Sequence, residues 1–310
     1  MIGSTQKSKP GSLKRRSERS ESLAGYLFAA PSVIFFTVFV GIPIFMTIFV
    51  LSFSDFSLLR PIVFNGFTNI RSLFVDPDFK TIVINTLKFI AIIAPLHIIL
   101  GLILAVAVDA IRSKAMQGIF RTVLYFPLIV TTASIVLVWS YLYDTNFGVF
   151  NWLLRQFNVA PLPWLDDVKW SLLSVAIFSA WKFIGNAFLY YFIGLQNVPE
   201  TYMEAASIDG ANKLQAFFRI KLPLLTPTLF FVITTTLINC FQMFDEPYFL
   251  TKGGPGVSSQ TIAMHIYRKG FGEYHFGYAS CLGLILFVIV LLVTFVQFGL
   301  QGKWVTYDNE

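Results

Sequence analysis

Charged residues are scarce in this sequence. They make up 13% of its 310 residues, whereas soluble domains carry about 25%. Apolar residues make up 55%, and the mean hydropathy is +0.68. Several uncharged apolar runs exceed the ~20 residues that a helix needs to cross a hydrocarbon core. The composition therefore excludes a soluble globular domain and predicts a helical protein that crosses a membrane several times.

Cysteine and histidine are scarce as well. Cys240 and Cys281 both fall in apolar runs, which excludes a disulfide framework. The 3 histidines are isolated from one another, and no Cys/His cluster has metal-ligand spacing, so we expect no metal site. The sequence has no G-x-x-x-x-G-K-[ST] motif that would hold nucleotide phosphates, and no nucleophile–base arrangement stands out. The net charge of +6 does not indicate nucleic-acid binding, because many of the basic residues crowd into the N-terminal tail.

Six apolar segments fit membrane spans. They cover approximately residues 23–53, 81–108, 122–143, 170–196, 226–250 and 276–300. Residues 1–20 are rich in Ser, Lys and Arg and are expected to be a disordered cytoplasmic tail. The membrane domain would then occupy residues 21–305, and residues 306–310 would form a short cytoplasmic tail.

The distribution of Lys and Arg predicts the orientation in the membrane. With the N-terminus inside, the inside segments hold 13 of these residues and the outside loops hold 8, while Lys88 and Lys182 lie within spans. Both termini are therefore expected in the cytoplasm. Trp139, Tyr141 and Tyr143 end the third span and are expected to form an aromatic belt at a membrane interface.

Residues 197–225 form a polar loop between the fourth and fifth spans. Pro199 suits the first turn of a helix, and Gly210 would end that helix because glycine readily adopts positive φ. A second short helix is expected to follow and to stop at Pro223, because proline lacks the N–H that a helix needs. By the orientation above, two angled helices would project on the cytoplasmic side.

This loop resembles the EAA loop of the membrane subunits of ABC importers. The pattern E-A-A-x-x-x-G, nine variable residues, then I-x-L-P is matched by Glu204, Ala205, Ala206, Gly210, Ile220, Leu222 and Pro223, with Asp209, Ala211 and Pro227 as further matches. An ordinary amphipathic loop helix is disfavoured by seven matches at this spacing. The resemblance implies an all-α polytopic membrane protein with the type I ABC importer (MetI-like) permease fold. It also implies that Glu204, Ala205, Ala206, Asp209, Gly210, Ala211, Ile220, Leu222 and Pro223 couple the chain to a separate ATPase, which binds ATP and magnesium; the chain itself would not be an enzyme.

Polar side chains within the spans are candidates for a solute pathway. A charged side chain at the centre of a bilayer costs about 2.5–3.5 kcal/mol, so it usually faces a cavity or a partner. The candidates are Lys182, Asn186, Asn239, Gln242, Asp245 and Tyr248. Asn239, Gln242 and Glu246 would share one helix face at three- and four-residue spacing. A structural role in holding helices together is the alternative, and for Lys88 and Lys182 the sequence does not decide between the two.

Residues 244–256 (F-D-E-P-Y-F-L-T-K-G-G-P-G) and 266–280 resemble the carbohydrate-uptake branch of these permeases, the maltose and lactose importer type. The resemblance extends over approximately residues 20–305. It implies uptake of an oligosaccharide or polyol by alternating access across the cytoplasmic membrane of a prokaryote. It also implies three partners besides lipid: a second, homologous permease, an ABC ATPase dimer and an extracytoplasmic solute-binding protein. The first outside loop has only about 26 residues, which favours the shorter six-span form.

Two other functions remain open. An importer of the same class could carry sn-glycerol 3-phosphate or another charged solute, with Lys88 and Lys182 serving a phosphate group. A stand-alone secondary transporter could use Asp245 or Glu246 as its proton site. The EAA loop argues against the second alternative because such a transporter needs no docking helix, and no internal repeat is evident in the sequence.

Overall fold

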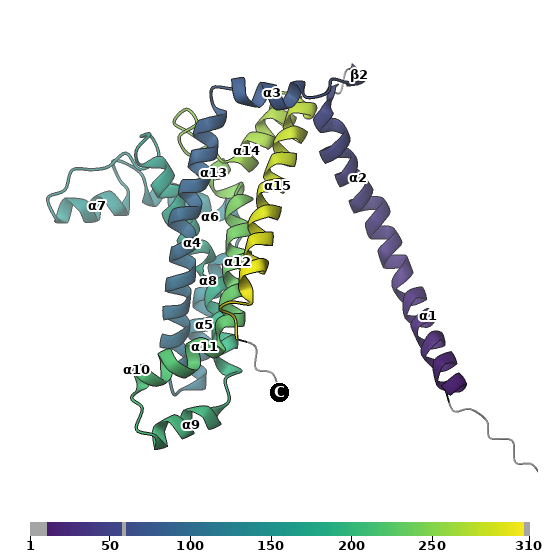
Figure 1. The fold of residues 1–310 in the computed structure, drawn as a ribbon. Coiled ribbons are helices and arrows are strands. Elements are labelled where there is room, and N and C mark those ends of the chain that lie inside the picture. The colour runs from purple at the N-terminus through teal and green to yellow at the C-terminus, as the bar shows by residue number, and fades with distance from the viewer. Residues whose placement is uncertain (1–10, 58–59, 307–310) are drawn as a thin grey trace, which may run out of the picture.

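The computed structural model describes residues 11–57 and 60–306 and is mostly helical (Figure 1). The α-helices are α1 (Gly11–Phe36), α2 (Ile42–Phe45), α3 (Thr68–Val75), α4 (Phe79–Asp109), α5 (Lys114–Ile129), α6 (Thr132–Leu142), α7 (Val149–Gln156), α8 (Ser171–Gln196), α9 (Glu200–Ile208), α10 (Lys213–Ala216), α11 (Leu222–Leu224), α12 (Thr226–Phe241), α13 (Asp245–Leu250), α14 (Ile262–Tyr267) and α15 (Phe276–Gln301). Short π- or 3-10-helical segments occupy Thr37–Gly41, Met46–Val50, Leu51–Phe53, Phe217–Lys221 and Arg268–Gly272. The strands β1 (Ser54–Ser57) and β2 (Arg60–Phe64) form an antiparallel hairpin in which Ser54 pairs with Phe64.

Four helical stretches are long and apolar enough to cross a membrane: Ala24–Phe53, α4, α8 and α15. Two further stretches qualify if each bent pair counts as one span. One pair is α5 with α6, bent by 99°, and the other is Lys213–Leu224 with α12, bent by 65°. The prediction of a polytopic helical membrane protein is confirmed, and six spans are reached when both bent pairs are counted.

Three boundary predictions are wrong. Residues 11–20, expected to be a disordered tail, belong to α1, whereas residues 1–10 lie outside the described part of the chain. The third span is not one helix, because Val130 and Thr131 are extended between α5 and α6, shortly after Pro127 removes a backbone donor from the last turn of α5. The fifth span ends at Phe241 rather than Leu250, since the chain turns before α13 begins.

The first span stands apart from the rest of the bundle (Figure 1). None of the most apolar part of Ala24–Phe53 is buried, and Phe35 and Phe36 are exposed. Near its C-terminal end it meets α15, where the rings of Phe49 and Phe287 lie 6.5 Å apart edge to face. So large an apolar surface must be covered by lipid or by another membrane protein.

The expected aromatic belt at the end of the third span is only partly present. Tyr141 is exposed, but Trp139 and Tyr143 are buried in an aromatic cluster with Phe150 and Phe178. The Tyr143 hydroxyl donates a hydrogen bond to the backbone of α8, at 2.8 Å. Two of the three residues therefore pack the interior instead of marking an interface.

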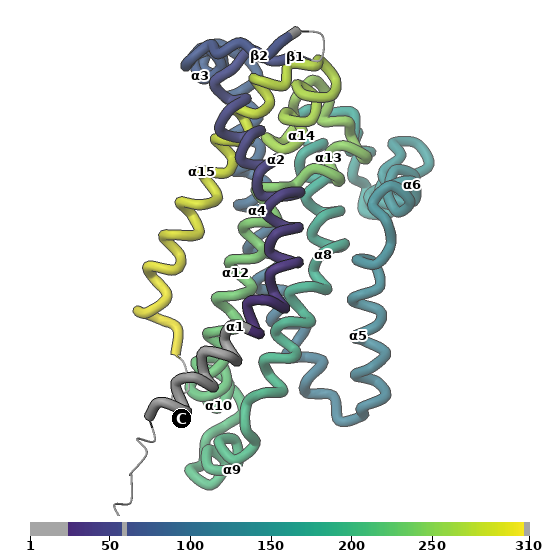
Figure 2. The backbone as a smooth tube through the Cα atoms, turned by 90° about the vertical axis from the view of Figure 1, so that its right-hand side faces the viewer, coloured from purple at the N-terminus to yellow at the C-terminus, as the bar shows by residue number. Residues whose placement is uncertain are grey.

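The core is organised around α4 and α8, which lie side by side along the bundle (Figures 1 and 2). Small residues allow this close packing. A Cβ atom on Gly101 of α4 would lie 2.7 Å from the Cβ of Ala187, and one on Gly185 of α8 would lie 2.4 Å from the carbonyl oxygen of Leu124 in α5. Both helices can therefore approach their neighbours only because these positions lack side chains.

Replacing Gly185 with leucine is expected to separate α8 from α5, because the new side chain would collide with backbone that cannot rotate away. The thermal midpoint of the detergent-purified protein should fall by several degrees. Gly283→Leu is the matched control, since a Cβ at Gly283 on α15 would meet nothing within 4 Å. Equal midpoints for the two variants would contradict the packing described above.

Asp76 joins three elements at the end of the bundle opposite α9. Its Oδ2 accepts hydrogen bonds from the hydroxyl of Tyr278 at 2.7 Å and from Nε2 of the buried His265 at 3.3 Å. Burial acts to raise the pKa of Asp76, but hydrogen bonds from Tyr278, the Asp78 backbone and His265 hold that pKa below its usual value. Burial also lowers the pKa of His265, which Asp76 only partly offsets.

Acid is therefore expected to loosen this end of the bundle. Because both folded-state pKa values are depressed, the stability that these groups contribute is present above their unfolded pKa values and is lost as the pH falls. For His265 the loss begins below about pH 6.5. Thermal midpoints measured between pH 8 and 5 should decline, and His265→Gln, which keeps a donor toward Asp76 but does not titrate, should flatten the decline. An unchanged slope in the variant would refute this assignment.

Candidate functional site

The loop of residues 197–225 lies at the end of the bundle that also holds the described start of α1 and the end of α15 (Figures 1 and 2). It contains α9 and α10, as the sequence predicts. Pro199 is the N-cap residue of α9 and Glu200 supplies an acidic group to its first turn. In α10, the side chain of Asn212 accepts from the Gln215 N–H at 2.8 Å, and the Gln215 side chain accepts from the Asn212 N–H at 2.9 Å.

The turn between these helices depends on Gly210. Its φ is +77°, a conformation that side chains rarely adopt. Its N–H donates to the Ser207 carbonyl at 3.2 Å, and the Ala211 N–H donates to the Ala206 carbonyl at 2.9 Å. This pair of bonds is the Schellman motif that closes helix C-termini. The glycine therefore fixes the angle at which α10 leaves α9.

Pro223 does not stop the second helix, contrary to the prediction. The helix continues to Leu224 and bends at Leu225. The π-helical turn Phe217–Lys221 shifts the hydrogen-bond ladder, so that the Leu222 N–H reaches back to Phe217. Pro223 then lies in the first turn of α11, where a missing N–H is tolerated.

The nine residues predicted to couple to an ATPase fall into two groups. Glu204, Ala205, Asp209 and Gly210 are exposed, whereas Ala211, Ile220, Leu222 and Pro223 are half-buried and Ala206 is buried. Three apolar side chains that the pattern does not contain, Ile208, Leu214 and Phe218, are exposed by 87%, 69% and 56%. The loop therefore presents carboxylates and apolar side chains together, as a protein-docking surface does.

An ion pair connects this loop to the bundle. Lys221 Nζ lies 3.0 Å from Asp109 Oδ2 at the end of α4, and both side chains are about one-quarter exposed. The side chain of Gln117 donates to the Ile111 carbonyl at 2.9 Å and holds the connection between α4 and α5. The ion pair is therefore a direct contact between the loop and the end of α4.

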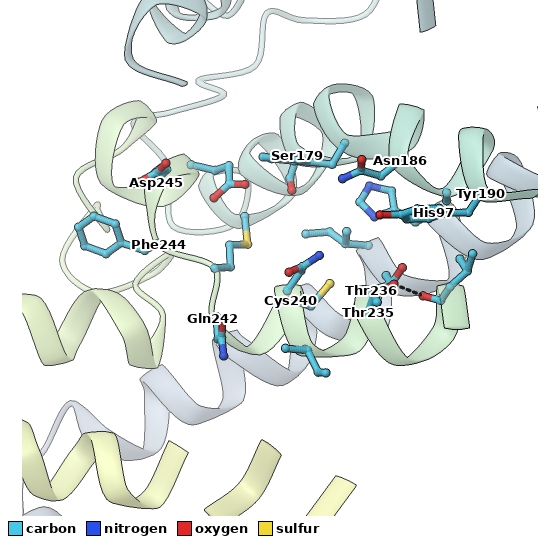
Figure 3. A pocket seen from close by; sticks show the side chains of 18 residues that line it. His97, Ser179, Asn186, Tyr190, Thr235, Thr236, Cys240, Gln242, Phe244 and Asp245 are labelled. Atoms are coloured by element: carbon cyan, nitrogen blue, oxygen red, sulfur yellow. Dashed lines mark hydrogen bonds between the residues drawn. The ribbon is translucent and has the colours of Figure 1, made fainter. Parts of the chain in front are cut away.

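A cavity of about 590 Å³ lies between α4, α8, α12 and the turn into α13 (Figure 3). Its polar lining consists of His97, Ser179, Asn186, Tyr190, Thr235, Thr236, Asn239, Gln242, Asp245 and Glu246. Apolar lining comes from both sides, including Ile93, Phe183 and Val232. A mostly preformed cavity with apolar walls and a few convergent polar groups is typical of a small-molecule site.

Four of the six candidate pathway residues line this cavity: Asn186, Asn239, Gln242 and Asp245. Lys182 and Tyr248 do not. The predicted single face of Asn239, Gln242 and Glu246 is wrong, because the helix ends at Phe241 and Glu246 belongs to α13. The turn nevertheless brings all three to the same cavity. Their convergence thus results from a broken helix rather than from helical spacing.

Lys182 is buried and does not line the cavity, and its ammonium group is hydrogen-bonded to Thr132. Its Nζ donates to the Thr132 hydroxyl at 2.5 Å, and that hydroxyl lies 3.5 Å from Asp245 Oδ2. Glu246 is 6% exposed and also lies within electrostatic reach of Lys182. The charge of Lys182 therefore acts on two carboxylates at a distance, and the Thr132 hydroxyl links it to Asp245. Lys88, by contrast, is exposed on α4.

Aromatic side chains border the cavity at α13. Phe244 lines it, and Tyr248 stacks on Phe244 with ring centroids 5.0 Å apart. Tyr267 of α14 contacts both rings, at 5.1 and 5.4 Å. Tyr248 thus supports the cavity wall from behind, and Tyr267 extends the aromatic surface toward the end of the bundle opposite α9 (Figure 1).

His97, Ser179, Thr235 and Thr236 also line the cavity, but no motif or spacing in the sequence points to them. Hydroxyl residues are common in membrane helices, and an isolated histidine has no motif around it. Only their position relative to the turn at Gln242–Phe244 identifies them. Among the described residues, no group of three or more His, Cys, Asp or Glu side chains could hold a metal ion.

The chain belongs to the family described as binding-protein-dependent transport system inner membrane component, whose model matches residues 97–304. This stretch contains the whole loop of residues 197–225 and every cavity-lining residue except Ile93. The resemblance inferred from the EAA pattern is thereby confirmed at the level of the family.

Curated relatives align over nearly the full length of the chain. It is 33% identical to the probable ABC transporter permease protein YesP of Bacillus subtilis, over 96% of each protein. It is 30% identical to the arabinooligosaccharides transport system permease protein AraP of the same organism, over 92% of this chain and 90% of AraP. It is 31% identical to the sn-glycerol-3-phosphate transport system permease protein UgpA of Agrobacterium fabrum, over 91% and 96%.

A solved structure supports the fold. The chain matches a bacterial ABC transporter involved in the import of the acidic polysaccharide alginate with a TM-score of 0.78 and 21% identity, over 95% of this chain and 99% of that one. The predicted ABC importer permease fold is therefore confirmed.

Proposed function

We propose that this chain is the permease subunit of an ATP-driven importer that moves a neutral carbohydrate, an oligosaccharide or polyol, across the cytoplasmic membrane by alternating access. The lining of the cavity is the observation that supports a carbohydrate as the substrate. Amides, hydroxyls and aromatic rings converge there, while the described lining residues include two carboxylates and no Lys or Arg. Hydroxyls both donate and accept hydrogen bonds, so a polyhydroxy solute suits this mixture.

A phosphate ester such as sn-glycerol 3-phosphate is the second candidate, and the similarity to UgpA favours it. The electrostatics of the cavity oppose it. Lys182, the cation expected to serve a phosphate, instead donates to Thr132 and lies within electrostatic reach of Asp245 and Glu246. An anionic solute in the cavity would meet those carboxylates without a lining cation to offset them.

The loop of residues 197–225 is the proposed docking site for the ATPase. Its exposed carboxylates and apolar side chains suit a cleft on a partner, and the Asp109–Lys221 pair offers a mechanical link to α4. Closure of the nucleotide-bound ATPases would draw two such loops together and open the cavity to the outside. The proposed assembly also contains a second permease and an extracytoplasmic solute-binding protein. Both termini of this chain would lie in the cytoplasm.

The test begins with mild-detergent purification from native membranes and identification of the co-purifying chains. The complete complex is then reconstituted in vesicles, and ATP-dependent uptake is measured for a panel of linear neutral saccharides and for sn-glycerol 3-phosphate. Uptake of a neutral saccharide that is not inhibited by the phosphate ester supports the proposal. Uptake of the phosphate ester alone refutes the substrate class, and uptake by the lone chain without ATP refutes the importer assignment.

A further inference from the structure

Three aromatic rings form a continuous row that begins at the cavity. Phe244 lines the cavity beside Asp245, at one end of the pocket (Figure 3). The centroid of the Tyr267 ring lies 5.1 Å from that of Phe244, and the Phe271 ring stacks on Tyr267 with centroids 5.4 Å apart. Tyr267 ends α14, and Phe271 lies in the turn that follows, near α3 at the end of the bundle opposite α9 (Figure 1). We call Phe244, Tyr267 and Phe271 the aromatic track.

Other side chains pack α13 and α14 into the bundle. The buried residues of these two helices are Glu246, Pro247, Leu250, Ile262, Met264 and His265. Tyr267 and Phe271, by contrast, are 40% and 65% exposed. Their ring surfaces therefore remain free for a ligand after the helices have packed, and packing alone does not account for two large rings at these positions.

Charged groups at both ends of the aromatic track indicate that it faces water rather than lipid. Asp245 is exposed at the cavity end. At the other end, Arg268 and Glu273 lie within three residues of Phe271 and pair at 3.4 Å, and the Arg268 side chain is 49% exposed. Charged side chains are costly in hydrocarbon. Apolar rings in an aqueous path suit a solute that has an apolar face as well as polar groups.

We propose that the aromatic track is a carbohydrate-binding surface outside the cavity, on which the sugar rings of the solute lie as the solute passes between the cavity and the end of the bundle opposite α9. The C–H face of a pyranose ring is apolar and packs on the face of an aromatic ring, while its hydroxyl groups stay in water. The spacings of 5.1 and 5.4 Å leave no gap between successive aromatic rings. This inference rests on the proposed function and adds to it a path to the cavity.

Leucine substitutions remove the ring and keep an apolar side chain. In the reconstituted complex, ATP-dependent uptake of the transported saccharide, measured well below its KM, should fall about 3- to 10-fold in Tyr267→Leu and in Phe271→Leu. Tyr267→Phe keeps the ring and should retain wild-type uptake. The thermal midpoints of these variants should match that of the wild type, because the replaced rings are exposed.

Phe74 provides a matched control. It lies on α3 near the same end of the bundle, it is 78% exposed, and its ring contacts Phe79 rather than the aromatic track. Phe74→Leu should leave uptake unchanged. A photoreactive diazirine derivative of the saccharide gives a readout other than transport: it should label residues 262–272 in the wild type, and this labelling should fall in Phe271→Leu but not in Phe74→Leu.

Three results would overturn the inference while the transport function stands. They are wild-type uptake in both leucine variants, labelling confined to the cavity, and a loss of uptake that follows a loss of thermal stability. Uptake of sn-glycerol 3-phosphate alone by the wild-type complex would instead refute the substrate class, and with it the ligand assigned to the aromatic track.

Discussion

Replacing Lys182 with methionine is expected to lower the free energy of unfolding by about 3–5 kcal/mol, the usual cost of removing one partner from a buried charge cluster. Lys182 is 3% exposed, and its ammonium group lies within electrostatic reach of Asp245 and Glu246. Methionine fills a similar volume, so the loss would come from carboxylates left without a cation. The measurement is thermal and denaturant unfolding of the purified protein in detergent.

Two variants make this prediction specific. The double variant Lys182→Met/Glu246→Gln removes one negative charge together with the positive one and should recover a large part of the lost stability. Lys88→Met removes an exposed lysine from α4 and should change stability by less than about 0.5 kcal/mol. If Lys182→Met were as mild as Lys88→Met, Lys182 would not be the counter-charge of this cluster.

Replacing Gly210 with proline is expected to reduce ATP-driven uptake by the reconstituted complex at least about tenfold. Proline requires φ near −65°, whereas Gly210 has φ +77°, and proline also lacks the N–H that bonds Ser207. The angle between α9 and α10 would change, and the exposed side chains of both helices could no longer meet one cleft. Basal ATP hydrolysis and membrane insertion should persist, because the turn is exposed and distant from the core.

Gly210→Asn is the matched control, since asparagine tolerates positive φ and keeps the backbone N–H. A Cβ at this position would meet nothing within 4 Å, so the control introduces no collision. Uptake should therefore remain within a few-fold of the wild type. Normal uptake by Gly210→Pro would refute the role of this turn in coupling ATP hydrolysis to transport.

The class of protein and the loop of residues 197–225 could be predicted from the sequence because both depend on local properties. Apolar run lengths reflect the thickness of the bilayer, and the helix–glycine–helix pattern around Gly210 depends on the conformations available to single residues. Predictions failed where tertiary contacts override local preferences. Pro223 is accommodated by a preceding π turn, and Trp139 and Tyr143 are drawn into an aromatic cluster that no spacing rule identifies.

Only some of the residues that line the cavity could be predicted from the sequence. Asn186, Asn239, Gln242 and Asp245 were selected because polar groups in apolar spans are costly, which is a property of each residue alone. His97, Ser179, Thr235 and Thr236 carry no comparable signal. Lys182 was expected to line the solute pathway, but its ammonium group donates to Thr132 and does not line the cavity. The order of residues in the sequence does not reveal this contact.

The sequence by itself thus determined the membrane location, the family and the turn that positions α9 and α10, since hydropathy and backbone preference act residue by residue. The tertiary structure decided which polar groups meet. The break after Phe241 turns α13 back toward α8, and the close approach of α4 to α8 at Gly101 brings His97 to the same cavity. These arrangements depend on how whole helices pack. Packing is determined by the volumes of side chains from residues that are far apart in the chain.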